Sequence, residues 1–160
     1  MSSNVPVIRK ISWLAFFFQL LLLSVLSYTY YLLKITEPFI WAAVTYSLLA
    51  FALRNLIAVN HRHALKLVRE KKFVEAIPFF EKSFNFFTEN SWIDKYRFLT
   101  LLSSSGMCYR EMALCNIAFS YSQENNGLKA IEYYTKVINE YPNNGMAQAG
   151  LKMLNSISNT

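Results

Sequence analysis

The sequence predicts an all-α protein, with an N-terminal two-helix transmembrane hairpin followed by a domain of antiparallel helix pairs. Two long apolar runs fill the first third of the chain, and amphipathic helical periodicity follows from residue 60 onward. No segment alternates apolar and polar residues as a half-buried strand does. Composition agrees, because 54% of the 160 residues are hydrophobic and only 16% are charged, against about 25% in an average soluble domain.

Composition also excludes several classes of protein. Four glycines and four prolines are too few for a collagen-like or disordered chain. Two cysteines cannot staple a disulfide scaffold, and they suit a reducing compartment. The length allows one domain and one further element, but not two catalytic domains.

The first predicted span is residues 11–33, which carry no charge. At about 1.5 Å per residue, this run crosses the roughly 30 Å hydrocarbon core. A core helix of a soluble bundle would keep a polar face, whereas Phe16 to Leu23 is apolar all round and is broken only by Gln19. A cleaved signal peptide is the other alternative, but its apolar region is shorter and ends in small residues.

The second predicted span is residues 38–59, uncharged until Arg54. We expect Arg54 to extend its long stem to the headgroups, so that the whole stretch can span. Pro38 suits the first turn of a helix. Aromatic side chains that favour membrane interfaces flank the link at 34–37, namely Tyr28, Tyr30, Tyr31 and Trp41.

Positive charge predicts the orientation of the hairpin. The N-terminal tail, residues 1–10, carries Arg9 and Lys10, while Lys34 in the link is balanced by Glu37. Positive flanks stay inside, so both termini and the C-terminal domain are expected in the cytoplasm. A basic cluster after the second span is expected at the lipid surface: Arg62, Lys66, Arg69, Lys71 and Lys72. Nucleic-acid binding is the rival explanation, but the membrane explains the charge without it, so no nucleic-acid partner is predicted.

Residues 60–160 are predicted to form five or six helices joined by short polar loops. Within 111–144, Leu114 and Ile117 share a helix face, and further positions recur at fixed intervals: Ala118, Tyr121, Ala130, Tyr134 and Pro142. This spacing resembles the tetratricopeptide (TPR) repeat, in which small residues let two helices approach and a proline ends the second helix.

A weaker copy of the same pattern occupies residues 57–90, with Ala64, Leu67, Ala76 and Phe80 at matching intervals. Ser83 stands at a position for a small residue, and Thr88 replaces the closing proline. Between the copies we expect an inserted helix at 91–105, started by a capping-box-like Ser91 and Asp94. Residues 145–158 are expected to form a capping helix.

The search for chemistry finds no active site. His61 and His63 are two residues apart, so on a helix they cannot chelate one metal, and both are expected to be exposed. Cys108 and Cys115 lack the spacing of a zinc site and are expected to be packing residues. No phosphate-binding, metalloprotease or nucleophile-elbow motif occurs. The prediction is therefore a protein that is not an enzyme, with no cofactor, metal or small-molecule substrate.

The resemblance implies a membrane-tethered protein–protein interaction module of the adaptor or scaffold type. The alternative is a structural or assembly subunit of a membrane complex, because several small residues allow close packing between spans: Ser24, Ser27, Ala42, Ala43, Ser47 and Ala50. Deleting the hairpin separates the two, since an adaptor would keep its soluble partner.

The resemblance also implies a binding surface on the first helix of each pair. The residues expected there are His61, Arg62, Leu65, Arg69, Met112, Cys115, Asn116, Phe119 and Gln123. Cys115 and Phe119 stand where a carboxylate clamp would need Lys or Asn, so no clamp is predicted. Such a surface suits a protein or peptide segment that is apolar and carries acidic residues. The alternative is that the inserted helix covers Phe119.

Overall fold

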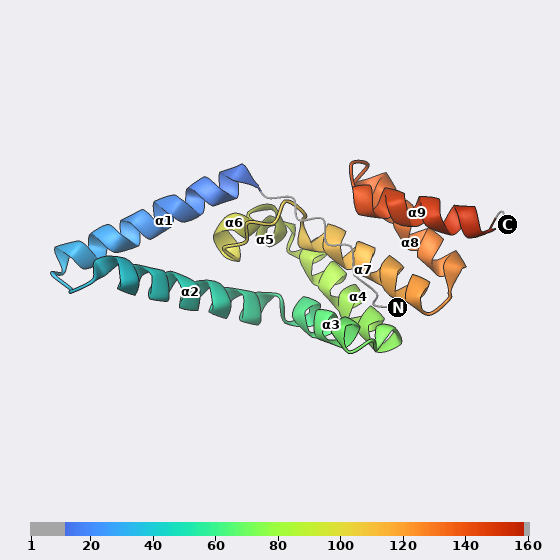
Figure 1. Ribbon diagram of the computed structural model, residues 1–160, viewed down its shortest axis with the longest axis horizontal. Helices are drawn as coiled ribbons and strands as arrows, with labels where there is room; N and C mark the ends of the chain where they lie inside the picture. Colours follow the sequence, from blue (N-terminus) through green and yellow to red (C-terminus); the bar gives the residue numbers. More distant parts are fainter. Residues whose placement is uncertain (1–11, 159–160) are drawn as a thin grey trace.

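The computed structural model describes residues 12–158, and within that range it contains nine helices and no strand (Figure 1). The all-α prediction is thus confirmed for this part of the chain. The expectation for the N-terminal tail, residues 1–10, falls outside the described residues.

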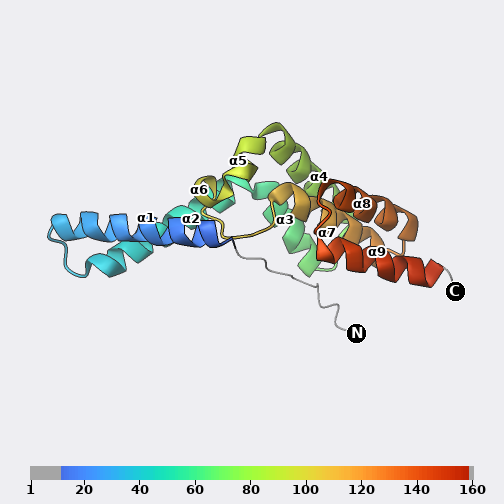
Figure 2. The ribbon, with the colours of Figure 1, turned by 90° about the horizontal axis from the view of Figure 1, so that it is seen from above.

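The two apolar runs form a helical hairpin that projects from the rest of the molecule as a long arm (Figures 1 and 2). Helix α1 spans Trp13–Leu32 and α2 spans Pro38–Ile57. The Ser12 hydroxyl accepts a hydrogen bond from the amide of Ala15 at 3.4 Å and so caps the N-terminus of α1. The turn between the helices uses left-handed backbone at Lys34 and Glu37, and Pro38 then starts α2.

Five further helices pack one after another into a stack beside the hairpin: α3 (Val59–Arg69), α4 (Phe73–Glu89), α7 (Tyr109–Gln123), α8 (Gly127–Glu140) and α9 (Gly145–Ser158). Short turns make α3–α4, α7–α8 and α8–α9 antiparallel neighbours. Helix α7 lies at the centre, packed on α4 and α8 (Figure 1).

Two clusters of buried side chains hold this stack together. The first joins α3, α4 and α7 through Phe80 and Ile117, with Ala64 and Ala76 fully buried. The second joins α7, α8 and α9 through Tyr134, Val137 and other residues. Small residues at these contacts let the helix backbones approach closely.

In the segment 111–144, Ala118 and Ala130 are fully buried and Tyr134 is 5% exposed. Tyr121 is only half-buried and stacks on the ring of Tyr133, with centroids 5.6 Å apart. Helix α8 ends two residues before Pro142. In the earlier segment, which has Thr88 in place of a proline, α4 continues to Glu89.

Residues 91–105, expected to form one inserted helix, instead form two short helices and a loop, and we call this segment the insert. Helix α5 covers Ser91–Lys95, α6 covers Arg97–Thr100, and the backbone of Tyr96 between them departs from helical dihedral angles, with φ −100° and ψ 31°. The Arg97 guanidinium donates to the carbonyls of Asp94, Ser105 and Gly106, each at 3.1 Å, which folds the loop back on the helices. The capping-box expectation is wrong, because α5 follows Asn90 without a side-chain cap.

A third buried cluster lies where the hairpin, the insert and the stack meet. Ala58, at the bend between α2 and α3, packs with Phe87 of α4, Leu101 of the insert and Tyr109 of α7. The rings of Phe87 and Tyr109 stack with centroids 4.6 Å apart. We call these four residues the junction cluster.

Candidate membrane and protein-contact surfaces

The hairpin presents most of its large apolar side chains outward. Both helices are long and apolar enough to cross a membrane. The residues buried on them are all small, namely Ala15, Ser27, Ala42 and Ala50. The Tyr30 hydroxyl and Thr45 Oγ1 lie 2.7 Å apart and join the two helices by a hydrogen bond. Typical outward residues are more than half exposed: Trp13, Leu14, Phe17, Leu21, Phe39, Leu48, Phe51 and Leu56.

Arg54 does not simply reach outward from the end of α2, as expected from its sequence position. Its guanidinium donates to the carbonyl of Leu101 at 3.1 Å and also to that of Leu102. From α1, the Gln19 amide donates to the same Leu102 carbonyl at 3.1 Å. These two polar side chains therefore tie both helices of the hairpin to the insert.

Sequence reasoning did not assign this role to Gln19 and Arg54, although a signal was present. Gln19 alone interrupts the apolar stretch from Phe16 to Leu23, and Arg54 alone is charged within α2. A polar group in such a setting needs a nearby partner. Its partner here is backbone distant in sequence, which no spacing pattern reveals.

The insert also holds the start of α7. The carboxylate of Asp94, whose side chain is buried, accepts the amide of Tyr109 at 2.7 Å and that of Arg110 at 3.0 Å. Cys108 adds a weak cap, because its Sγ accepts the amide of Glu111 at 3.4 Å. Asp94 thus caps α7, which begins fifteen residues later in the sequence, and does not cap α5, the helix to which it belongs.

The expectation that both histidines are exposed is wrong for His61. Its side chain is 3% exposed, since this position of α3 faces α4 and α7. The ring packs edge-on against Phe80 and Tyr109, and Nδ1 lies 3.2 Å from the Ser83 hydroxyl. Burial lowers the pKa of His61 to about 4. His63 is exposed and lies against Phe79.

Cys115 cannot line a binding surface either, because it is 2% exposed. Its Sγ lies 3.3 Å from Asn144 Nδ2, which also donates to Glu111 at 2.8 Å. Asn144 in turn caps α9 by accepting the amide of Ala147 at 2.8 Å. Burial raises the pKa of the Cys115 thiol to about 12, so the reactive thiolate is disfavoured.

The other seven predicted contact residues differ in exposure. Arg62, Arg69 and Gln123 are exposed, whereas the remaining four are half-buried: Leu65, Met112, Asn116 and Phe119. Leu65 and Phe119 both pack against the first core cluster. The ring that covers Phe119 is Phe73 at the start of α4, with centroids 5.9 Å apart. The insert lies elsewhere, near Met112, which packs against the junction cluster.

The basic residues expected at the lipid surface are all exposed. They lie on α3 and on the turn that follows it: Arg62, Lys66, Arg69, Lys71 and Lys72. Arg62 stands over the ring of Phe51 of α2, at 5.7 Å from its centroid. Lys72 pairs with Glu70 at 3.4 Å, which leaves the cluster strongly positive.

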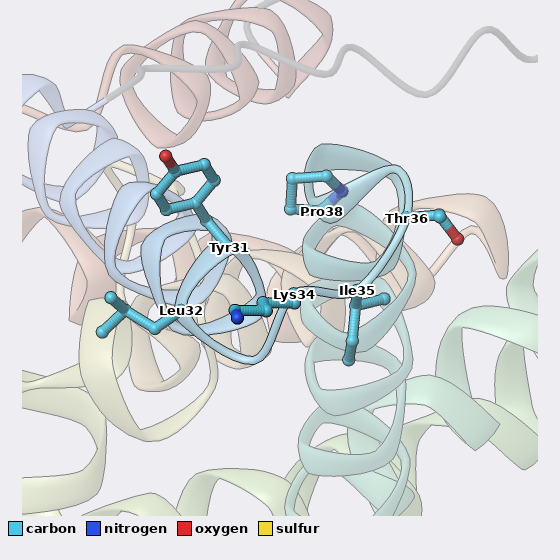
Figure 3. A pocket seen from close by; sticks show the side chains of 6 residues that line it. All are labelled: Tyr31, Leu32, Lys34, Ile35, Thr36 and Pro38. Carbon is cyan, nitrogen blue, oxygen red and sulfur yellow. The ribbon is translucent and has the colours of Figure 1, made fainter.

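A shallow pocket of about 410 Å³ lies at the tip of the hairpin (Figure 3). Tyr31 from α1 and Pro38 from α2 flank it, and Lys34 is the one ionisable amine along its edge.

Among residues 12–158, no group of three His, Cys, Asp or Glu side chains is placed to hold a metal ion. No family model, no curated protein and no solved structure matches the chain. Its function is therefore inferred from its own residues.

Proposed function

We propose that the chain is a membrane-tethered protein–protein interaction module that carries out no catalysis. The observation that carries this proposal is the hairpin, which buries only small residues and turns its large apolar side chains outward. An exposed apolar surface of this extent needs lipid or protein around it. Lipid suits both helices, because each is long and apolar enough to cross the hydrocarbon core.

The C-terminal helices would be the interaction part, as a TPR-like unit. The close approach of α7 and α8 at the buried Ala118 and Ala130 supports this interpretation, as does the packing of α4 on α7. With His61 and Cys115 removed from the surface, Arg62, Arg69 and Gln123 are the exposed contacts that remain. Their charge suits an apolar segment that carries acidic residues. Tethering would raise the effective concentration of this surface for membrane-bound partners.

The proposed orientation places both termini and the helical stack in the cytoplasm, on the side of the basic cluster. Reporter fusions after Lys72 and after Thr160 should therefore report the cytoplasm. A fusion after Thr36, in the turn of the hairpin, should report the opposite side. A fusion at Thr160 that reports the outer side would overturn this orientation, and fusions at Thr36 and Thr160 that report the same side would exclude the two-span arrangement.

The second candidate function is a structural or assembly subunit of a membrane complex. Of the six small residues expected to allow close packing, three remain exposed after α1 and α2 have packed: Ser24, Ala43 and Ser47. Small exposed residues allow another transmembrane helix to approach closely. This observation favours a role in which the hairpin itself makes the protein contacts.

Two sets of substitutions separate these functions in crosslinking and affinity purification from mild detergent. One set enlarges the hairpin surface with Ala43→Leu and Ser47→Leu, and the other reverses the charge of the stack with Arg62→Glu and Arg69→Glu. Loss of partners with the second set alone supports the adaptor. Loss with the first set alone supports the subunit, and equal melting temperatures are the control for folding.

A further inference from the structure

The insert exposes a short stripe of large apolar side chains. Trp92 is 59% exposed, Tyr96 45% and Leu99 53%. Their neighbours turn inward, since Leu101 is fully buried and Ile93 packs against the junction cluster. The exposed stripe is therefore not needed for the core of the helical stack.

The stripe is linked to the hairpin through Tyr96. The ring of Tyr96 lies 6.3 Å from that of Phe98, which packs edge-on against Phe18 of α1 at 5.3 Å. Both ribbon views show α6 beside the end of the hairpin that is nearer the stack (Figures 1 and 2). Gln19, which holds Leu102, lies six residues into α1 from Trp13, a rise of about 9 Å. The insert thus reaches past the first turn of the predicted span.

In the loop that follows α6, four carbonyl groups accept hydrogen bonds from other parts of the protein. Those of Leu101 and Leu102 accept from Arg54 and Gln19, as described above. The carbonyl of Ser104 accepts the amide of Ser12 at 3.1 Å, and that of Ser105 accepts from Arg97 at 3.1 Å. Non-helical backbone is tolerated in a water-poor layer only when protein satisfies such groups.

The charged groups of the insert are likewise bonded within the protein, except for Lys95. The buried carboxylate of Asp94 accepts hydrogen bonds from two amides of α7, and the guanidinium of Arg97 donates hydrogen bonds to three carbonyls. Lys95 remains on the outside, with its ammonium 5.5 Å from the centre of the Tyr96 ring. An aromatic side chain beside a long basic one is a combination typical of the headgroup layer.

We propose that the exposed side chains of residues 92–99 form a membrane contact in addition to the two spans, which lies in the interfacial layer with Trp92, Tyr96 and Leu99 against phospholipid. This inference rests on the proposed insertion of the hairpin. The ligand is the bilayer interface itself, recognised by two amphipathic rings, an aliphatic side chain and one ammonium group.

The test uses the full-length protein in phospholipid vesicles whose acyl chains carry bromine near the headgroup end. One variant keeps a single tryptophan at the insert, through Tyr96→Trp with Trp13, Trp41 and Trp92 changed to Phe. A second keeps Trp41 alone, on the hairpin. A third places the single tryptophan on α8 by Leu128→Trp, because Leu128 is 85% exposed and belongs to the stack.

The proposal expects the tryptophans at 96 and 41 to lose most of their fluorescence and the one at 128 to keep it. Quenching at 41 without quenching at 96 overturns the membrane contact of the insert but leaves the hairpin in place. Quenching at neither position overturns both. A tryptophan at 96 that escapes bromine and yet is shielded from aqueous iodide would mean that a second copy of the chain covers the insert, which also overturns the proposal. If Tyr96→Trp fails to fold, the variant that keeps the native Trp92 alone takes its place.

Discussion

The buried carboxylate of Asp94 accepts hydrogen bonds from two backbone amides in the first turn of α7, so its loss would leave two donors without a partner. We expect Asp94→Ala to lower the free energy of unfolding by about 2–3 kcal/mol, because an unpaired buried amide costs about 1–3 kcal/mol. Chemical denaturation of the full chain in detergent, followed by circular dichroism, measures the change. The matched control is Glu89→Ala, on an exposed acidic residue of α4. Equal stability of the two variants would contradict the role of Asp94 as a cap.

Protonation of His61 couples folding to pH. Its pKa is about 4 in the folded protein and 6.5 ordinarily, so the unfolded chain binds the proton more readily between these values. The contribution of the neutral ring is complete above pH 6.5 and is lost as pH falls toward 4. The loss amounts to about 3 kcal/mol at most, since one pKa unit is worth about 1.4 kcal/mol.

Denaturation curves between pH 4 and pH 7 measure this coupling. His61→Gln should flatten the fall in stability toward acid pH, because the titrating group has gone. His63→Gln, on the exposed neighbouring histidine, should leave the slope as it is in the wild type. If His61→Gln retained the full slope, the acid sensitivity would have to come from other groups.

At the scale of helices, Gly150 sets how closely α9 lies on α8. A Cβ atom at this position would stand 2.6 Å from Cζ of Tyr134, whose ring is held in the second core cluster. We expect Gly150→Ala to destabilise the protein by about 1–3 kcal/mol through overpacking. Gly127→Ala is the matched control, since a Cβ there meets nothing within 4 Å. Thermal melting of both variants decides the point, and equal melting temperatures would exclude a tight α8–α9 contact.

The helices of the hairpin could be predicted from sequence because their signal is local. Long uncharged runs, one separating proline and the polar link at 34–37 are enough to predict two apolar helices side by side. The break of the insert at Tyr96 could not be predicted, since it depends on Arg97 reaching carbonyls as far away as Gly106. Periodicity alone favoured one continuous helix there.

The candidate contact residues were harder to predict than the fold. The position of a residue on a helix face follows from spacing, but its exposure depends on which helices pack there. His61 illustrates this, because α4 and α7 both cover its face of α3. Cys115 is buried in the second core cluster and contacts Asn144 in the turn before α9, and no feature of its own helix indicates that contact.

For the whole molecule, the hydrogen bonds that Gln19 and Arg54 donate to the insert help to hold the stack in place on the hairpin. We expect the double variant Gln19→Leu, Arg54→Met to release the loop at 101–105, because the carbonyls of Leu101 and Leu102 lose their donors. Amide hydrogen exchange of the detergent-solubilised protein should then become faster in this loop, while that of α8 stays the same. Ser24→Ala is the control, since its hydroxyl bonds only within α1, to Leu20. Unchanged exchange in the loop would show that other contacts hold it.

The hairpin and the helical stack are joined at two separate places, by the peptide at Ala58 and by the bonds around Leu102 and Ser104. A body joined at one point can swivel in every direction, whereas a body joined at two points keeps only one axis of rotation. The two attachments therefore restrict the orientation of the stack relative to the hairpin, whereas attachment at Ala58 alone would leave the stack free to reorient in every direction. The direction in which Arg69 and Gln123 face can then change only by rotation about that axis.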